Sequence, residues 1–186
     1  MVAKGAAAPV AGSLAYLGVK ATNDELFDVL LIKSPLVLIA WALLAFVPRW
    51  KYSQPLAKAI GLFFAVLYVL LMVDGMVFHP MDIPKTYGPK FSTLLDLFSS
   101  LEGVHKLFSD KGACFGGWVH YVVFDLWAGI WISNDAIEKG FPLILLPVVL
   151  FLTMMLGPSG LFTYFLLKFF VDQIKKLFGA PATKKD

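Results

Sequence analysis

Four apolar segments, each long enough or nearly long enough to cross a bilayer as a helix, dominate this chain of 186 residues. A helix needs about 20 mostly apolar residues to cross the hydrocarbon core. The segments cover residues 26–47, 56–77, 115–132 and 142–170. Hydrophobic residues make up 59% of the chain and charged residues 16%, whereas soluble domains average about 45–50% apolar and about 25% charged residues. The pattern predicts an all-α membrane protein with four transmembrane helices.

Prolines and glycines predict where these helices bend or begin. Pro35 removes a backbone hydrogen bond inside the first segment and predicts a kink there. Pro55 stands just before the second segment, where a first-turn proline is tolerated. Pro147 and the sequence GPSG at 157–160 interrupt the last segment. A bundle can satisfy the freed backbone groups, so we expect one kinked span there.

The long polar connection between the second and third spans carries apolar residues at helical spacing. This pattern predicts an amphipathic helix that either lies along the membrane interface or packs on the helix bundle. The predicted organisation is a flexible N-terminal segment (1–25), a four-helix transmembrane domain (26–170) and a basic C-terminal tail (171–186). Four crossings place both termini on the lysine-rich side with the long connection, which is the cytoplasmic or stromal side.

Charge and cysteine usage exclude several classes of function. The net charge of +3 comes largely from lysines that flank apolar spans, and this arrangement does not suggest nucleic-acid binding. The single cysteine, Cys114, cannot form an internal disulfide, and no Cys/His cluster predicts a metal site. The chain also lacks a glycine-rich phosphate loop and an HExxH motif. We therefore expect neither nucleotide chemistry nor soluble-type hydrolase chemistry.

Ionisable residues inside the spans are the candidate functional groups. A charge at a helix centre costs about 2.5–3.5 kcal/mol on insertion scales, so such residues normally face a partner. The candidates are Asp28, Lys33, Asp74, His79, His120, Asp125 and Lys168.

The third segment, GWVHYVVFDLWAGIWI at 117–132, contains two of these candidates. Asp125 is either a proton-transfer group, the ion-pair partner of Lys33 or Lys168, or a hydrogen-bond partner of the interrupted backbone near GPSG. His120 is either an axial ligand to a tetrapyrrole metal, a proton shuttle or an interhelical hydrogen-bonding residue.

Helical geometry sorts the neighbours of these two residues into stripes. His120 and Asp125 differ by about 140° around the helix, so they do not share a face. Residues spaced by three or four positions do share one; this stripe contains Trp118, Tyr121, Asp125 and Gly129. His120 and Trp127 fall on the neighbouring stripe. Gly129 would let another helix or a flat ligand approach closely, and the abundant aromatic residues suit a long apolar ligand.

Two sequences, WVHYVVFDLWAGIWI and LPVVLFLTMMLGPSGLFTYFLLK, resemble the abscisic-acid-deficient-four family of small plastid membrane proteins. The resemblance covers most of residues 26–170. It implies a four-helix protein of the plastid envelope or thylakoid that is needed to make neoxanthin from violaxanthin, by opening an epoxide and rearranging it to an allene. The residues that match the two motifs by position are His120, Tyr121, Asp125, Gly129, Gly157, Pro158, Gly160 and Tyr164.

Two main functions are considered. The first, which the resemblance implies, is a carotenoid epoxide isomerase, in which Asp125 or Tyr121 protonates the epoxide and His120 acts as base. The second is a non-catalytic pigment-binding or linker subunit of a thylakoid photosystem or antenna complex, with carotenoid or chlorophyll bound; the aromatic content and the three histidines suggest it. A small transporter is a third function, because the last segment is broken. The expected partners are membrane lipids, carotenoids and photosystem or antenna subunits. The expected ligand contacts are His79, His120, Trp118, Trp127, Gly129, Gly157, Gly160 and Tyr164.

Overall fold

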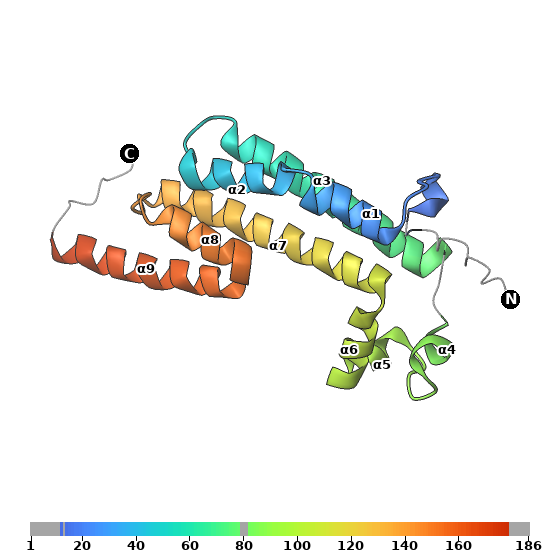
Figure 1. The fold of residues 1–186 in the computed structure, drawn as a ribbon. Coiled ribbons are helices and arrows are strands. Elements are labelled where there is room, and N and C mark those ends of the chain that lie inside the picture. The colour runs from blue at the N-terminus through green and yellow to red at the C-terminus, as the bar shows by residue number, and fades with distance from the viewer. Residues whose placement is uncertain (1–11, 13, 79–81, 179–186) are drawn as a thin grey trace, which may run out of the picture. The chain divides into compact units, whose positions relative to one another are not determined.

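The computed structural model describes residues 12, 14–78 and 82–178, and every regular element within them is helical (Figure 1). In chain order the elements are η1 (Ala15–Leu17), α1 (Asn23–Phe27), η2 (Asp28–Ile32), α2 (Leu36–Phe46), α3 (Ser53–Val73), η3 (Asp74–Phe78), α4 (Ile83–Tyr87), α5 (Leu94–Phe98), α6 (Leu101–Ser109), α7 (Lys111–Glu138), α8 (Leu146–Leu156) and α9 (Pro158–Leu177). The predicted all-α class is confirmed for the described residues.

Within the described residues, three helical segments are long and apolar enough to cross a membrane. They are Asn23–Phe46, Ser53–Phe78 and Lys111–Glu138, with 24, 26 and 28 residues. At about 1.5 Å per residue, each exceeds the hydrocarbon thickness of about 30 Å. The first three predicted spans therefore correspond to helices of sufficient length. The first is interrupted between Ile32 and Leu36, where the sequence predicts a kink, because Pro35 has no N–H to donate.

The fourth predicted span has a different structure from the expected single kinked helix. Its residues form two helices, α8 and α9, which pack against each other and reverse the chain direction between them (Figure 1). Gly157 makes the turn with φ 41° and ψ −94°, a backbone conformation that glycine adopts without the penalty of a Cβ. Pro158 then starts α9 at a position where proline is favoured. A continuous kinked helix over 142–170 is therefore wrong.

The chain divides into two compact units. The first contains the described residues of Met1–Pro35 and Leu62–Tyr121, and the second contains those of Leu36–Gly61 and Val122–Asp186. Helices α3 and α7 contribute residues to both units. The core of the second unit consists mainly of buried side chains from α2, α3, α7, α8 and α9, and Tyr164 is the largest of those that are fully buried.

The connection between α3 and α7 forms three short helices, α4–α6. The predicted amphipathic helix is split at Ser99 and Ser100 into α5 and α6. Ser100 caps α6 by accepting a hydrogen bond from the N–H of Gly103. Leu97 is fully buried, whereas Leu95 and Leu101 are 78% and 85% exposed. A location of this segment at the membrane interface stays a prediction.

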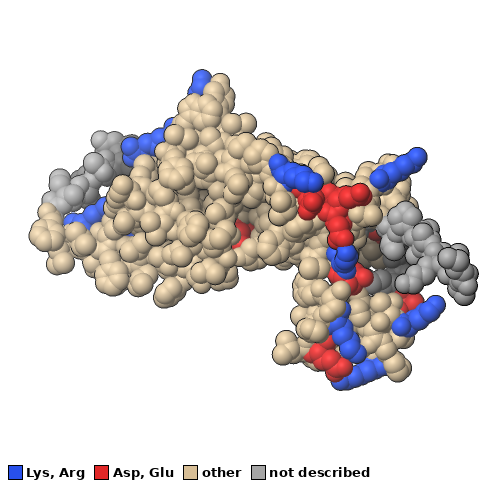
Figure 2. All heavy atoms as spheres, viewed as in Figure 1, with Lys and Arg blue, Asp and Glu red and all other residues tan. Residues whose placement is uncertain are grey.

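The distribution of surface charge differs along the chain. Figure 2 shows acidic and basic side chains gathered around α4–α6 and few of them over α2, α7 and α8. Large apolar side chains such as Leu38, Phe124 and Val148 are exposed on these three helices instead. This is the surface that a helix in contact with lipid requires.

Candidate functional site

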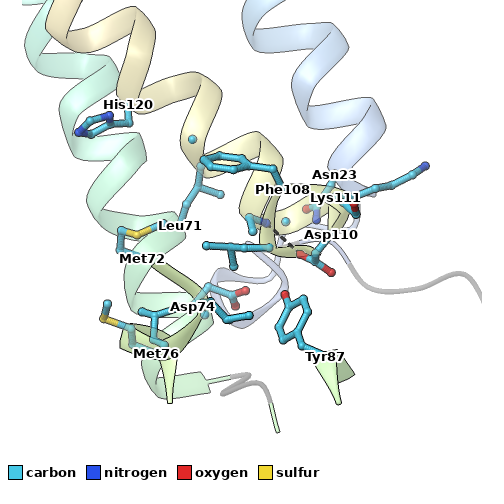
Figure 3. A pocket seen from close by; sticks show the side chains of 18 of the residues that line it. Asn23, Leu71, Met72, Asp74, Met76, Tyr87, Phe108, Asp110, Lys111 and His120 are labelled. Carbon is cyan, nitrogen blue, oxygen red and sulfur yellow. Dashed lines mark hydrogen bonds between the residues drawn. The ribbon is translucent and has the colours of Figure 1, made fainter. Parts of the chain in front are cut away.

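A cavity of about 1200 Å³ lies in the first unit (Figure 3). Its walls come from the start of α1, from the end of α3 with η3, from the start of α7, and from the α4–α6 helices. The lining is largely apolar and includes Leu71, Met72, Leu97, Phe98, Leu107 and Phe108. Small-molecule sites usually measure about 300–1,000 Å³, so this cavity has room for a large apolar ligand.

Polar groups lie toward both ends of this cavity. His120 lies toward one end, and Asp74, Tyr87 and Asp110 lie toward the other (Figure 3). The ring of His120 lies 5.3 Å from that of Tyr68, centroid to centroid. Asp74 is buried, with 6% of its surface exposed. Burial, and then the negative charge of Asp110, raise the pKa of the Tyr87 phenol.

Two glycines of α7 allow the cavity walls to approach closely. A Cβ atom placed on Gly116 would lie 2.9 Å from Cε of Met72. A Cβ atom on Gly117 would collide with the ring of Phe108. Any larger residue at position 117 must therefore displace the Phe108 ring, which lines the cavity. The sequence gives one signal for these contacts, the Gly-Gly pair near the start of an apolar helix.

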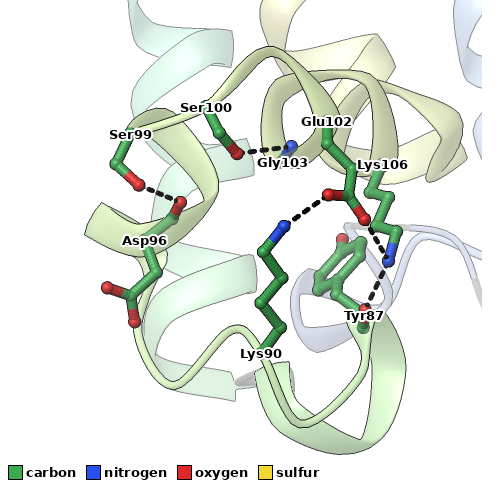
Figure 4. Close-up of polar contacts among 8 residues, drawn as sticks. All are labelled: Tyr87, Lys90, Asp96, Ser99, Ser100, Glu102, Gly103 and Lys106. Carbon is green, nitrogen blue, oxygen red and sulfur yellow. Dashed lines mark hydrogen bonds and ion pairs between the residues drawn. The ribbon is translucent and has the colours of Figure 1, made fainter.

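An ion-pair network holds together the α4–α6 side of the cavity (Figure 4). Glu102 pairs with Lys90 at 2.6 Å and with Lys106 at 3.3 Å. Lys106 also donates a hydrogen bond of 3.1 Å to the carbonyl of Tyr87. Hydrogen bonds from the two lysines lower the pKa of the Glu102 carboxyl. The network links α4 and the residues that follow it to α6.

The start of α1 is attached to the start of α7. Lys111 pairs with Asp24 at 2.5 Å. Further along the two helices, the ring of Phe27 lies 6.0 Å from that of Phe115 and 6.2 Å from that of Trp118. Trp118 therefore contacts an aromatic residue of α1, and it is not among the residues that line the cavity.

Asp125 lies in the second unit, against the turn between α8 and α9. It is buried, and a Cβ atom placed on Gly157 would lie 2.6 Å from its Oδ1. A carboxylate at a helix N-terminus is favoured by the partial positive charge of that helix end. The position agrees with one of the three expected roles, that of a partner for the interrupted backbone near GPSG.

The ion pairs expected for Asp125 are formed by other residues. Lys33 pairs with Asp28 at 3.4 Å. Lys168 pairs with Asp135, which also accepts a hydrogen bond of 2.7 Å from the hydroxyl of Tyr164. Asp135 follows the predicted third span, so the sequence places it on the way out into water. The structure instead places it inside α7 with its side chain 15% exposed. Tyr164 and Lys168, which are one turn apart on α9, both contact its carboxylate.

The remaining predicted ligand contacts in the second unit are helix–helix contacts. A Cβ atom on Gly129 would lie 2.5 Å from Cζ3 of Trp41, so this glycine accommodates a neighbouring helix. Gly160 similarly accommodates the backbone of Thr153. Nε1 of Trp127 lies 3.3 Å from the position that a Cβ would take on Gly61.

The structure thus divides the predicted site residues. Of those residues, His120 lines the cavity of the first unit, and Tyr121 lies beside Trp118 with their ring centroids 6.0 Å apart. Asp125, Trp127, Gly129, Gly157, Gly160 and Tyr164 belong to the second unit. His79 lies outside the described residues.

Comparison with known proteins identifies the family. A family model described as ABA DEFICIENT 4-like matches residues 27–164. This range contains the first sequence motif, the second motif up to Tyr164, and the three long apolar helices of the described residues except the first four residues of Asn23–Phe46. No match was found among curated proteins or among solved structures.

Proposed function

The chain belongs to the ABA DEFICIENT 4-like family, and from this premise we propose that it is a plastid membrane protein that binds a xanthophyll in the cavity of the first unit. Three helices long and apolar enough to cross a membrane support the membrane location. The observation that supports a bound xanthophyll is the cavity itself, with about 1200 Å³ of space and mostly apolar walls. A long polyene buries its surface best in such a space.

The polar groups of the cavity fit one oxygenated end ring of a xanthophyll. The ring of His120 contacts that of Tyr68, and Asp74 lies six residues further along the same helical segment, or about 9 Å. A xanthophyll is much longer than this separation, so one end ring would lie between His120 and Asp74. The polyene would run along the apolar wall that contains Leu71, Met72 and Phe108 and continue out of the cavity. Hydrogen bonds to the end ring would fix its position, because an unpaired polar group in an apolar site is costly.

Isomerisation of violaxanthin to neoxanthin is the reaction proposed for this site. A proton is added to an epoxide oxygen, the C–O bond opens to a hydroxyl, and a proton is lost from the adjacent polyene carbon to give the allene. The formula is unchanged, so the reaction requires an acid and a base but no oxidant. His120 and Asp74 line the cavity, as do Asp24, Tyr68 and Lys111 of the long helices. We assign the acid–base roles to the first two of these residues rather than to Asp125 and Tyr121, which do not line the cavity.

Pigment binding without catalysis is the second candidate function. It is favoured by the position of Asp125, which lies against the α8–α9 turn and not in the cavity. In this function the chain is a subunit of a thylakoid photosystem or antenna complex, and His120 is the residue in the cavity that can ligate the metal of a chlorophyll.

Pigment analysis separates the two functions. The full chain is expressed in a bacterial host that makes violaxanthin, and the pigments of the membranes and of the purified protein are separated by chromatography. Neoxanthin in the membranes supports the isomerase. Violaxanthin that copurifies with the protein without any neoxanthin supports the pigment-binding subunit. Folded protein with neither pigment bound nor converted contradicts both.

A further inference from the structure

Three contacts fix the direction of α9 along α7. Asp125 lies against Gly157, and ten residues later along α7 Asp135 pairs with Lys168, eleven residues further along the chain from Gly157. At the end of α7, Lys175 donates hydrogen bonds of 3.0 Å to the carbonyls of Lys139 and Gly140. The contacts advance together along both helices. Helix α9 therefore runs parallel to the second half of α7, and α8 returns antiparallel to it.

The lengths of these helices place the α8–α9 turn near the middle of the bilayer. Asp125 lies near the middle of α7, a helix of 28 residues. Helix α8 has 11 residues, which is about 16 Å at 1.5 Å per residue, or roughly half of the hydrocarbon thickness. If α7 crosses the bilayer, the turn beside Asp125 lies near the bilayer midplane.

Backbone groups at this turn have partners. The N–H of Gly157 donates to the carbonyl of Thr153 at 2.9 Å, and the N–H groups of Gly160 and Leu161 donate to the carbonyl of Gly157 at 3.1 and 3.3 Å. Gly157 and Gly160 are both buried. Irregular backbone at membrane depth is tolerated where it is buried in protein, and this turn meets that condition.

We infer that α8 and α9 form a re-entrant hairpin, which enters the bilayer from the side where α7 ends, turns near the midplane and leaves on the same side. The inference does not depend on the proposed pigment. Counting crossings along the chain then gives three, not four. The end of α9 therefore lies on the opposite side of the membrane from the α4–α6 connection, and on the same side as residues 47–52.

This topology separates basic residues that four crossings would bring together. The lysines of the α4–α6 connection lie on one side, and Lys139, Lys175 and Lys176 lie on the other with Arg49 and Lys51. The excess of lysine on one side, from which the orientation of the chain is predicted, is then lost.

Cysteine labelling tests the hairpin directly. Cys114 is the only cysteine of the chain and is exposed, so Cys114→Ser gives a cysteine-free background. Single cysteines are then introduced as Lys51→Cys, Lys85→Cys and Lys176→Cys, all at exposed positions. Sealed membrane vesicles of known orientation are treated with a membrane-impermeant maleimide, before and after addition of detergent.

The three positions give different patterns for the two topologies. The hairpin predicts that positions 51 and 176 are labelled from one side and position 85 from the other. Labelling of 176 from the same side as 85 would overturn the inference, and so would labelling of 51 and 85 from the same side. Equal labelling of all three variants in detergent, with a single symmetric peak in size-exclusion chromatography, shows that the comparison is made on folded protein.

Discussion

The carboxylate of Asp125 lies against Gly157, the residue at which the chain turns from α8 into α9. This relationship explains why a buried carboxylate stands near the middle of a long apolar helix. The N-terminus of a 20-residue helix provides unpaired N–H groups and partial positive charge. Asp125 is placed to stabilise the turn, which is a structural role distinct from the chemistry of the cavity.

Gly157→Ala should destabilise the protein. The added Cβ would lie 2.6 Å from Oδ1 of Asp125, and the residue would keep a positive φ of 41°. Backbone strain of this kind costs about 1–3 kcal/mol, so we expect a lower unfolding temperature in detergent, followed by tryptophan fluorescence. Gly75→Ala is the matched control, because a Cβ there meets nothing within 4 Å. Equal unfolding temperatures for the two variants would argue against the close contact at Gly157.

Asp125→Asn should lower stability without changing pigment binding, whereas His120→Gln should reduce pigment binding without changing stability. Asp125 supports the α8–α9 turn, so its substitution should lower the unfolding temperature while the amount of bound pigment per folded protein stays unchanged. His120 lines the cavity and is exposed, so its substitution should reduce bound or converted pigment at nearly constant stability. Absorbance spectra and thermal unfolding of the purified variants measure both effects. Loss of pigment in Asp125→Asn with unchanged stability would show that Asp125 belongs to the pigment-binding site.

Substitutions around Asp135 should show strong coupling. Tyr164→Phe removes one hydrogen bond to the Asp135 carboxylate and should cost about 0.5–1.5 kcal/mol. Lys168→Met should cost more, since it leaves the partly buried carboxylate without its cation. Adding Asp135→Asn to Lys168→Met should then recover part of the loss. A double-mutant cycle from denaturant unfolding measures the coupling, and simple additivity would mean that the pair contributes nothing.

Acid should release the start of α5 within a defined pH range. Hydrogen bonds from the Ser92 hydroxyl and from the backbone and side chain of Thr93 lower the pKa of Asp96 from 3.8 to about 2. Because the pKa of Asp96 is lower in the folded state than in the unfolded state, its ionised carboxylate stabilises the folded state at pH values above the unfolded-state pKa. This contribution is lost as the pH falls from about 3.8 to about 2. Hydrogen exchange of the peptide that contains residues 92–99 should therefore show protection at pH 5 in the wild type.

The matched variant for this pH effect is Asp96→Asn. We expect it to lose protection of the same peptide at pH 5, and to differ little from the wild type at pH 2. Protection in the variant that equals the wild type at pH 5 would show that the carboxylate does not hold this turn.

The sequence predicts the long helices well because length and hydropathy determine them. The break at Pro35 is also predictable, since proline lacks the donor that a helix needs. The α8–α9 hairpin is not predictable in this way. Residues 142–170 have the composition of one long crossing, and the reversal depends on the backbone angle of Gly157 and on its contact with Asp125. Periodicity along one helix contains no information about such a contact.

The candidate site also combines features that the sequence predicts with features that depend on tertiary contacts. His120 and Asp74 are recognisable from sequence as ionisable residues in apolar helices, and both line the cavity. Helical spacing groups Tyr121 with Asp125, but it cannot show that the cavity lies on another face of α7. The contribution of α4–α6 to the cavity depends on contacts between residues far apart in the sequence, such as the hydrogen bond from Lys106 to the carbonyl of Tyr87.

The most direct test of the account is the amount of violaxanthin retained by purified protein when the cavity is filled. Met76 lines the cavity and is 64% exposed, whereas the adjacent Val77 is 65% exposed and does not line it. Met76→Trp should lower the pigment-to-protein ratio several-fold, while Val77→Trp should leave it unchanged, at equal unfolding temperature. Equal retention of pigment by both variants would contradict the assignment of the binding site to this cavity.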